Sequence, residues 1–279
     1  MSFTGIFAIG VSSLAAFAKG IQSVSSNVAN SDTTGYKRVR TDFEALLPAS
    51  RANAAGTGVS AGPRQLLSEQ GAIARDNETT HAAVAGEGFF VVSRAPGATA
   101  AGDFLYTRAG DFRPDADGNL VNAAGFYLQG TAATAGGAVS AQGLQTINLN
   151  RVPAGGDAGL LGDLVAVAIG GDGAVDATYS NGETHTIFRI PLALFVNENG
   201  LAPADRTAFS ATAASGAAEI ARAQSGRAGK IEGAALEAST VDLGVEFSAL
   251  IATQRAYSTG ARILSAADDL WRTLVGTAA

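Results

Sequence analysis

The last forty residues constrain the fold of this chain most strongly, because their apolar positions recur at alternating spacings of four and three. This spacing is typical of a helix that packs along a narrow seam against another helix. No proline follows Leu236, and Ser239-Thr240-Val241-Asp242 has the pattern of a helix N-cap, so we predict a helix over 239–279. Apart from the polar Gln254 and Asp268, its seam consists of Leu243, Phe247, Leu250, Tyr257, Ala261, Leu264, Trp271 and Val275.

The first thirty residues carry a matching apolar seam. The two terminal helices are therefore predicted to pair as a coiled coil, although each could instead dock separately on a globular middle. Both segments are rich in Ala, Gly and Ser, which allow close approach on several sides, as a helix surrounded by copies of itself requires. The N-terminal seam consists of Phe3, Phe7, Leu14, Phe17, Ile21, Val24 and Val28.

Composition excludes several classes of protein. The net charge is −6, and Lys37-Arg38-Val39-Arg40 is the one basic run, so a nucleic-acid partner is not expected. The absence of cysteine removes disulfides, thiolate metal sites and cysteine nucleophiles.

Polar residues interrupt every apolar run of about 20 residues, so we predict no transmembrane segment. The N-terminus lacks a basic n-region, and we interpret it as a retained amphipathic helix.

The middle of the chain has the pattern of an antiparallel β structure. Short apolar runs such as GEGFFVVSR alternate with turn residues, and Ser180-Asn181-Gly182 predicts a type I′ hairpin. The predicted fold class is α+β, with a mainly antiparallel β body between the paired terminal helices. The predicted order is a helix at 1–31, an extended arm at 32–76, a β body at 77–218, a return arm at 219–238 and a helix at 239–279.

Catalytic and metal-binding patterns are not found. His81 and His185 each lack a histidine or carboxylate at ligand spacing, which favours ordinary strand or surface positions. Asp115-x-Asp117-Gly118 lacks the distant glutamate of a calcium loop and is interpreted as a tight turn. We therefore predict a protein that is not an enzyme and has no cofactor and no metal. Its function is expected to depend on the interactions of its two terminal helices.

Both ends also resemble a known family. Asn27-Val28-Ala29-Asn30 followed by Thr33-Thr34-Gly35-Tyr36-Lys37 resembles the N-x-A-N…T-x-G-[FY]-K signature of the bacterial flagellar rod and hook proteins. The family's C-terminal motif, L-E-x-S-N-V-D-L…Q-R-x-Y, resembles two runs near the end of this chain. The first run extends from Leu236 and Glu237 through Ser239, Val241 and Asp242 to Leu243, and the second is Gln254-Arg255-Ala256-Tyr257. Thr240 replaces the common Asn. Several stretches of the middle are also similar to the body of these proteins.

The segment ending in Tyr179-Ser180-Asn181-Gly182 looks most like a hook protein. Hook proteins generally carry an additional outer β domain after the strand that ends in Y-L-Q-G, and here a short Gly-rich stretch takes its place. The chain thus has the length of a rod protein, and the resemblance implies a short hook protein, with a distal or proximal rod protein as the alternative. A secreted adhesive β protein that is oligomerised by its terminal helices is the alternative from another class.

The resemblance further implies a helical homopolymer whose inner wall is formed by the terminal helices. Its expected partners are the rod, hook-cap and hook–filament junction proteins and the flagellar type III export apparatus. Its expected location is the extracellular hook or the periplasmic basal body, reached without a cleaved signal peptide.

Overall fold

The computed structural model describes residues 3–46, 58–98, 101–133, 143–150 and 163–277. These residues divide into two compact units. The helical unit comprises residues 1–31, 37–66 and 241–279, and the body comprises residues 32–36 and 67–240. The α+β class predicted from the sequence is confirmed.

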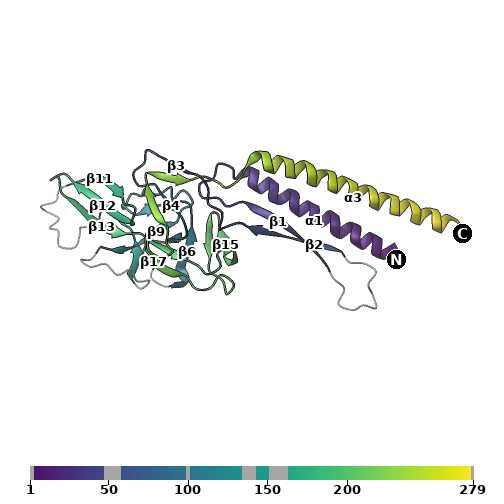
Figure 1. The fold of residues 1–279 in the computed structure, drawn as a ribbon, viewed down its shortest axis with the longest axis horizontal. Helices are drawn as coiled ribbons and strands as arrows, with labels where there is room; N and C mark the ends of the chain where they lie inside the picture. Colours follow the sequence, from purple (N-terminus) through teal and green to yellow (C-terminus); the bar gives the residue numbers. More distant parts are fainter. Residues whose placement is uncertain (1–2, 47–57, 99–100, 134–142, 151–162, 278–279) are drawn as a thin grey trace. The chain divides into compact units, whose positions relative to one another are not determined.

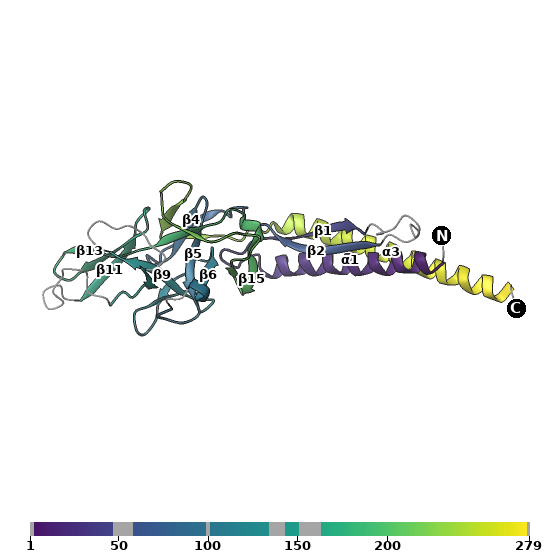
Figure 2. The same cartoon turned by 90° about the horizontal axis from the view of Figure 1, so that it is seen from below.

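The helical unit contains two long helices and one hairpin. Helix α1 spans Phe3–Ala29 and helix α3 spans Leu243–Thr277. Strands β1 (Val39–Ala45) and β2 (Val59–Gln65) pair in antiparallel fashion. α1 lies between α3 and this hairpin, and the end of α3 extends beyond the start of α1 (Figure 1, Figure 2).

The hairpin differs from the extended arm predicted for 32–76. Val39, Thr41 and Phe43 alternate with polar residues, a period-two pattern that could have indicated a strand. The Gly62-Pro63 pair in β2 obscures the matching pattern, since proline cannot donate a backbone hydrogen bond. Proline is tolerated here because the sheet has two strands and each strand is an edge.

The body is built around a sheet with thirteen strands among the described residues. Its longest path runs in the order β11-β12-β13-β9-β5-β6-β16-β15, and each of these neighbours is antiparallel. The strands of this sheet are β5 (Phe89–Ser93), β6 (Phe104–Thr107), β7 (Arg113–Pro114), β8 (Leu120–Val121), β9 (Tyr127–Ala132), β10 (Leu144–Thr146), β11 (Leu164–Ile169), β12 (Ala174–Tyr179), β13 (Thr184–Arg189), β14 (Pro191–Leu194), β15 (Ala202–Asp205), β16 (Ala208–Ser210) and β17 (Glu219–Arg222).

Two further strand pairs join the beginning of the body to its end. Strand β3 (Ile73–Arg75) pairs with β19 (Ala235–Glu237), and β4 (Ala82–Ala85) pairs with β18 (Lys230–Gly233). Residues 219–238, predicted as a return arm, therefore include three strands that complete the body. Short 3₁₀ turns at Ala101–Asp103 and Glu198–Gly200 connect other strands.

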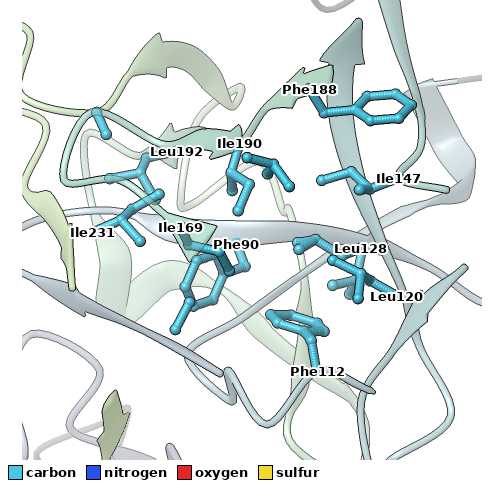
Figure 3. Close-up of a cluster of buried hydrophobic side chains, with 14 of the residues drawn as sticks. Phe90, Phe112, Leu120, Leu128, Ile147, Ile169, Phe188, Ile190, Leu192 and Ile231 are labelled. Atoms are coloured by element: carbon cyan, nitrogen blue, oxygen red, sulfur yellow. The ribbon is translucent and has the colours of Figure 1, made fainter. Parts of the chain in front are cut away.

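Large apolar side chains from many strands meet in the core of the body (Figure 3). The rings of Phe90 and Phe112 pack edge to face with centroids 5.4 Å apart, and both are fully buried. Such pairs stabilise a core by about 0.5–1.5 kcal/mol beyond the burial of their area. Leu128 and Ile190 extend the same cluster, so the body has a continuous apolar interior of its own.

The predicted turns are present, with one change of type. Tyr179 and Thr184 flank a hairpin as expected, but among its turn residues only Gly182 has a positive φ, of 85°. A type I′ turn needs positive φ at both central residues, so the predicted type is wrong. Asp115 forms the other predicted turn by accepting hydrogen bonds from the backbone amides of Asp117 and Asn119 at 2.9 and 2.8 Å.

One described helix segment, Phe7–Ala29, is long and apolar enough to cross a membrane by length and composition alone. This differs from the sequence-based expectation that no segment qualifies. Core helices and N-terminal signal sequences meet the same criterion, and here the segment packs against α3 and the hairpin.

Candidate functional site

The two terminal helices pack antiparallel through small residues. Gly10 faces Leu264, Leu14 faces Gly260, and Gly20 faces Thr253, so the α1 number rises as the α3 number falls. A Cβ atom built on Gly20 would lie 3.2 Å from the Thr253 methyl group. The helices thus pair as predicted, but at a glycine-rich contact, and a coiled coil in the predicted register is not confirmed.

The predicted seam of α3 lies largely away from α1. Thr253 and Gly260 contact α1 and are half-buried, and the buried Glu246 and Ala267 lie seven residues before and after them on the same side of α3. From the predicted seam, Leu250, Ala261 and Leu264 are half-buried, whereas Leu243, Phe247, Tyr257, Trp271 and Val275 are 41–52% exposed.

The predicted seam and the positions on the α1 side of α3 both repeat every seven residues, so the offset between them is constant along the helix. At about 100° per residue, Phe247 lies about 100° around the helix from Glu246, whereas Leu264, which contacts Gly10, lies about 60° from Ala267. Contact with α1 therefore covers only part of the predicted seam. Its first half forms a separate apolar stripe, continued by Ile251, which is 52% exposed.

The N-terminal seam is better covered. Val24 is buried, and Phe7, Leu14, Phe17, Ile21 and Val28 are half-buried, whereas the side chain of Phe3 lies outside the described residues. Phe17 also contacts Phe43 of the hairpin, with ring centroids 5.9 Å apart. α1 thus packs against both α3 and the hairpin, whereas the extensive contact of α3 in the helical unit is with α1.

Polar side chains on α1 attach the hairpin to it. The carboxamide of Asn27 is paired with the backbone of Val39, donating to its carbonyl at 2.8 Å and accepting from its amide at 2.9 Å. Lys19 donates to the Ala61 carbonyl at 2.9 Å, and the Thr41 hydroxyl donates to Ser23 at 2.8 Å. Asn27, predicted as a motif residue, therefore provides hydrogen-bond partners for both backbone groups of Val39, the first residue of β1.

A groove of about 430 Å³ follows the contact between α1 and α3. Its lining is apolar or small and includes Gly10, Phe17, Ala256, Gly260 and Ile263. The small side chains that let the helices approach also leave this space beside them. Apolar surface open to water in this way is typical of a binding surface.

Two residues of the turn motif, Gly35 and Tyr36, bond to the end of the body within the same unit. Gly35 has a φ of 67°, and its amide donates to the Glu237 carbonyl at 2.8 Å. The Tyr36 carbonyl accepts from the Thr240 amide at 3.1 Å. Of the other motif residues, Lys37 is fully buried, Thr33 is half-buried, and Asn30 donates from its side chain to the Ser26 carbonyl at the end of α1.

Helix α3 begins later than predicted. Its first residue is Leu243, and the Asp242 carboxylate accepts hydrogen bonds from the amides of Gly244 and Val245 at 2.8 and 3.1 Å. Asp242 is therefore the N-cap in place of Ser239. Leu236 and Glu237, just before the predicted start of the helix, pair with β3, and the amide of Thr240, which was predicted to be helical, donates to the Tyr36 carbonyl. Ser239 and Val241 are half-buried in this extended segment.

An ion pair joins the first turn of α3 to Arg38, the residue before β1. Glu246 is buried, and its carboxylate lies 2.5 Å from the guanidinium of Arg38. Sequence reasoning missed this pair because the two residues are far apart in the chain. Further along α3, Gln254 and Arg255 of the predicted motif are exposed, as is Tyr257.

Arg108, which sequence reasoning also missed, is nearly fully buried in the body. Its guanidinium donates to the Gly86 carbonyl at 2.9 Å, lies 3.5 Å from the Glu237 carboxylate and stacks 4.9 Å from the Phe89 ring centre. Burial lowers the pKa of Arg108, and the nearby Glu237 opposes this effect. Glu237, predicted as a motif residue, therefore has a buried cationic partner.

The histidines do have carboxylate neighbours, contrary to the sequence-based expectation. Nδ1 of His81 lies 2.7 Å from the Asp76 carboxylate, and Nε2 of His185 lies 3.2 Å from Glu183. The hydrogen bond with His81 lowers the pKa of Asp76. No group of three or more potential metal ligands occurs among the described residues. His81 is buried, which leaves its ring no access to a substrate in solution.

Comparisons with known proteins match three parts of this chain to flagellar families. Residues 83–177 match the flagellar hook protein FlgE/F/G D1 domain, residues 232–277 match the flagellar basal body rod FlgEFG protein C-terminal family, and residues 7–37 match the flagella basal body rod protein family. The three matches cover both terminal helices and much of the body.

Three relatives cover different shares of the chain. The flagellar basal-body rod protein FlgG of Agrobacterium fabrum is 30% identical over 280 positions, covering 94% of this chain and 95% of its own. The flagellar hook protein FlgE of Brucella suis is 27% identical over 397 positions, covering 99% of both chains. The flagellar hook protein FlgE of Salmonella typhimurium is 42% identical over 114 positions, covering 41% of this chain and 28% of its own. This chain therefore belongs to the family of flagellar hook and basal-body rod proteins and is a structural subunit of the bacterial flagellum.

Proposed function

We propose that this chain is a short hook subunit, which self-assembles through its terminal helices into the tubular joint between rod and filament. The local identity of 42% to a hook protein is higher than the 30% to a rod protein over nearly the whole chain, and this difference carries the proposal. In this role the polymer bends while it transmits torque.

The exposed stripe on α3 supports assembly through the helices. Phe247 and Ile251 are about half exposed in the helical unit. Burial of apolar surface is worth roughly 25 cal/mol per Å², so neighbouring subunits that cover this stripe would gain stability from each copy. A repeated set of such contacts favours an extended polymer if the two contacting surfaces differ.

A rod subunit is the second candidate, and chain length favours it. The alignment with the rod protein needs 280 positions for this chain of 279 residues, whereas the alignment with the Brucella suis hook protein needs 397. More than a hundred positions of that hook protein thus have no counterpart here. The place where hook proteins carry their outer domain falls mainly outside the described residues.

As a hook subunit, the protein would leave the cell through the flagellar type III export apparatus without a cleaved signal. α1 would then be retained in the mature subunit, which agrees with its many contacts to α3 and the hairpin. Its partners would be further copies of itself, the rod below, and the hook-cap and hook–filament junction proteins above. The mature location would be the extracellular hook.

Electron microscopy of basal bodies from cells that lack this gene tests the position. A complete rod without a hook is the expected result, and a tagged copy of the gene should restore the hook. A rod that ends early would overturn the hook assignment in favour of the rod. Intact flagella in the deletion strain would contradict both the hook and the rod assignment and would favour the adhesive protein instead.

A charge in the stripe tests the assembly surface. Leu250→Asp should abolish hook formation and swimming while the thermal unfolding of the body stays unchanged, because a buried unpaired carboxylate is costly at a subunit contact. Ala266→Asp places the same charge on an exposed part of α3 outside the seam and serves as the control. Normal hooks in the Leu250→Asp strain would exclude this stripe from the assembly contacts.

A further inference from the structure

The body holds the two ends of its own chain together. Residues 32–36 are the last part of the body before the hairpin, and 237–240 are its last part before α3. The Gly35 amide donates to the Glu237 carbonyl, and the Thr240 amide donates to the Tyr36 carbonyl. We call this pair of hydrogen bonds the exit clamp.

Gly35 allows the clamp to lie directly on the backbone of Arg108 and Ala109. A Cβ atom on Gly35 would be 2.5 Å from the Ala109 nitrogen and 2.6 Å from the Arg108 carbonyl carbon. Real Cβ atoms do not approach backbone so closely, and the φ of 67° also favours glycine. The N-terminal side of the clamp is therefore fixed by contact with one short backbone segment.

The side chain of Arg108 reaches the C-terminal side of the same clamp. Its Nη1 atom lies 3.5 Å from Glu237 Oε2, while Glu237 Oε1 accepts from the Gly71 amide at 2.8 Å. Arg108 is further held by the carbonyls of Val84 and Gly86 and by the ring of Phe89. Glu198 and Glu87 also contribute attraction to its charge.

We propose that Arg108 is a positioning residue for assembly, which fixes the turn at Gly35 and the strand at Glu237 against each other. The chain would then leave the body for the hairpin and for α3 at one defined point. This inference rests on the proposed function, because fixed exits matter to a subunit whose helices assemble with other copies.

The chemistry of the pair explains why an ion pair suits this role. Replacing a buried ion pair by apolar side chains of similar size often preserves or raises stability, so stability alone does not require it. A guanidinium, in contrast, binds carbonyls and a carboxylate in fixed directions. Apolar side chains at positions 108 and 237 would fill the same space but would not fix the direction in which the strand at residue 237 is held.

This difference between stability and fixed direction can be tested with variants of the full chain. The variants are Arg108→Met, Glu237→Leu and the two combined, with Arg189→Met as the control, since Arg189 pairs with Asp172 elsewhere in the body. The measurements are thermal unfolding, amide exchange at Gly35 and Thr240, and hook formation in cells.

Each single variant should lower the unfolding temperature because it leaves one buried charge without its partner. The double variant should recover to within about 3 °C of the wild type. It should nevertheless exchange the Gly35 and Thr240 amides about tenfold faster, as expected for a weakened hydrogen bond. Exchange in β5 should be unchanged, and hooks should be fewer. The control should retain both slow exchange at the clamp and normal hooks.

Two results would overturn the inference: slow exchange at Gly35 and Thr240 in the double variant, or normal hooks in a strain with fast exchange at the clamp. If the gene proves unnecessary for hook and rod, the proposed function fails, and the exchange data still decide whether Arg108 fixes the clamp. The two failures are thus distinguishable.

Discussion

The helical unit and the body differ in how they treat large apolar side chains. In the body, Phe90, Phe112 and Leu128 are completely buried, whereas Phe247, Ile251 and Ile263 on α3 are about half exposed. The body therefore obtains its apolar stabilisation from its own chain. The helices leave part of their apolar surface exposed to water, which is the surface that the proposed assembly would bury.

The largest expected effect comes from substituting one phenylalanine in each unit. Phe112→Ala should lower the free energy of unfolding of the body by about 3–5 kcal/mol, because it removes a buried ring and leaves a cavity. Phe247→Ala should change it by less than about 0.5 kcal/mol, since its ring is half exposed. Chemical denaturation followed by circular dichroism measures both.

Hook formation in cells should show the opposite order for variants that still fold. Phe247→Ala should reduce the number of hooks although the subunit remains stable. If Phe247→Ala instead destabilises the isolated subunit as strongly as Phe112→Ala, the contrast between the two units is wrong.

An intermediate effect is expected from the ion pairs on the body. Asp172 bridges Arg189 and Arg222, and hydrogen bonds from Arg222 and Arg189 lower its pKa from 3.8 to about 2 despite partial burial. Asp172→Asn should cost about 1.5 kcal/mol at pH 7, after allowance for the one-third exposure of the carboxylate.

The pH dependence of this cost follows from the lowered pKa. The stabilisation is fully present above pH 4 and is lost as the pH falls through about 2, where the native carboxylate becomes protonated. Thermal unfolding of both proteins between pH 2 and pH 7 measures it. A difference that persists undiminished at the lowest pH would show that the cost of the substitution is not electrostatic.

The smallest effect is expected at the cap of α3. Asp242→Ala should cost about 1 kcal/mol, because the amides of Gly244 and Val245 lose their acceptor. The loss should be confined to the first turns of α3, with faster amide exchange there and unchanged exchange in β5. Asp242→Ser is the control, since serine can accept the same hydrogen bonds. Loss of protection throughout the body would show that the cap also supports the second unit.

Sequence reasoning recovered the broad arrangement and part of the candidate site. The two helices, the β body and the turn at Asp115 follow from periodicity and turn residues, which are local signals. The hairpin of β1 and β2 was missed because its pattern is weak, and its stability depends on contacts with α1 such as that between Asn27 and Val39. The start of α3 was placed too early because the capping pattern at Ser239 is a local signal, whereas the amide of Thr240 bonds to Tyr36 about two hundred positions away.

The sequence by itself determined the family, the two long helices and the strand-rich middle, because motifs and short-range periodicity are written in consecutive residues. The tertiary structure alone decided which face of α3 meets α1, since that depends on which α3 residues lie against the glycines of a segment far away in the sequence. It also decided that Arg108 meets Glu237 and Arg38 meets Glu246. Such pairs join residues more than a hundred positions apart, and no local pattern encodes their distance.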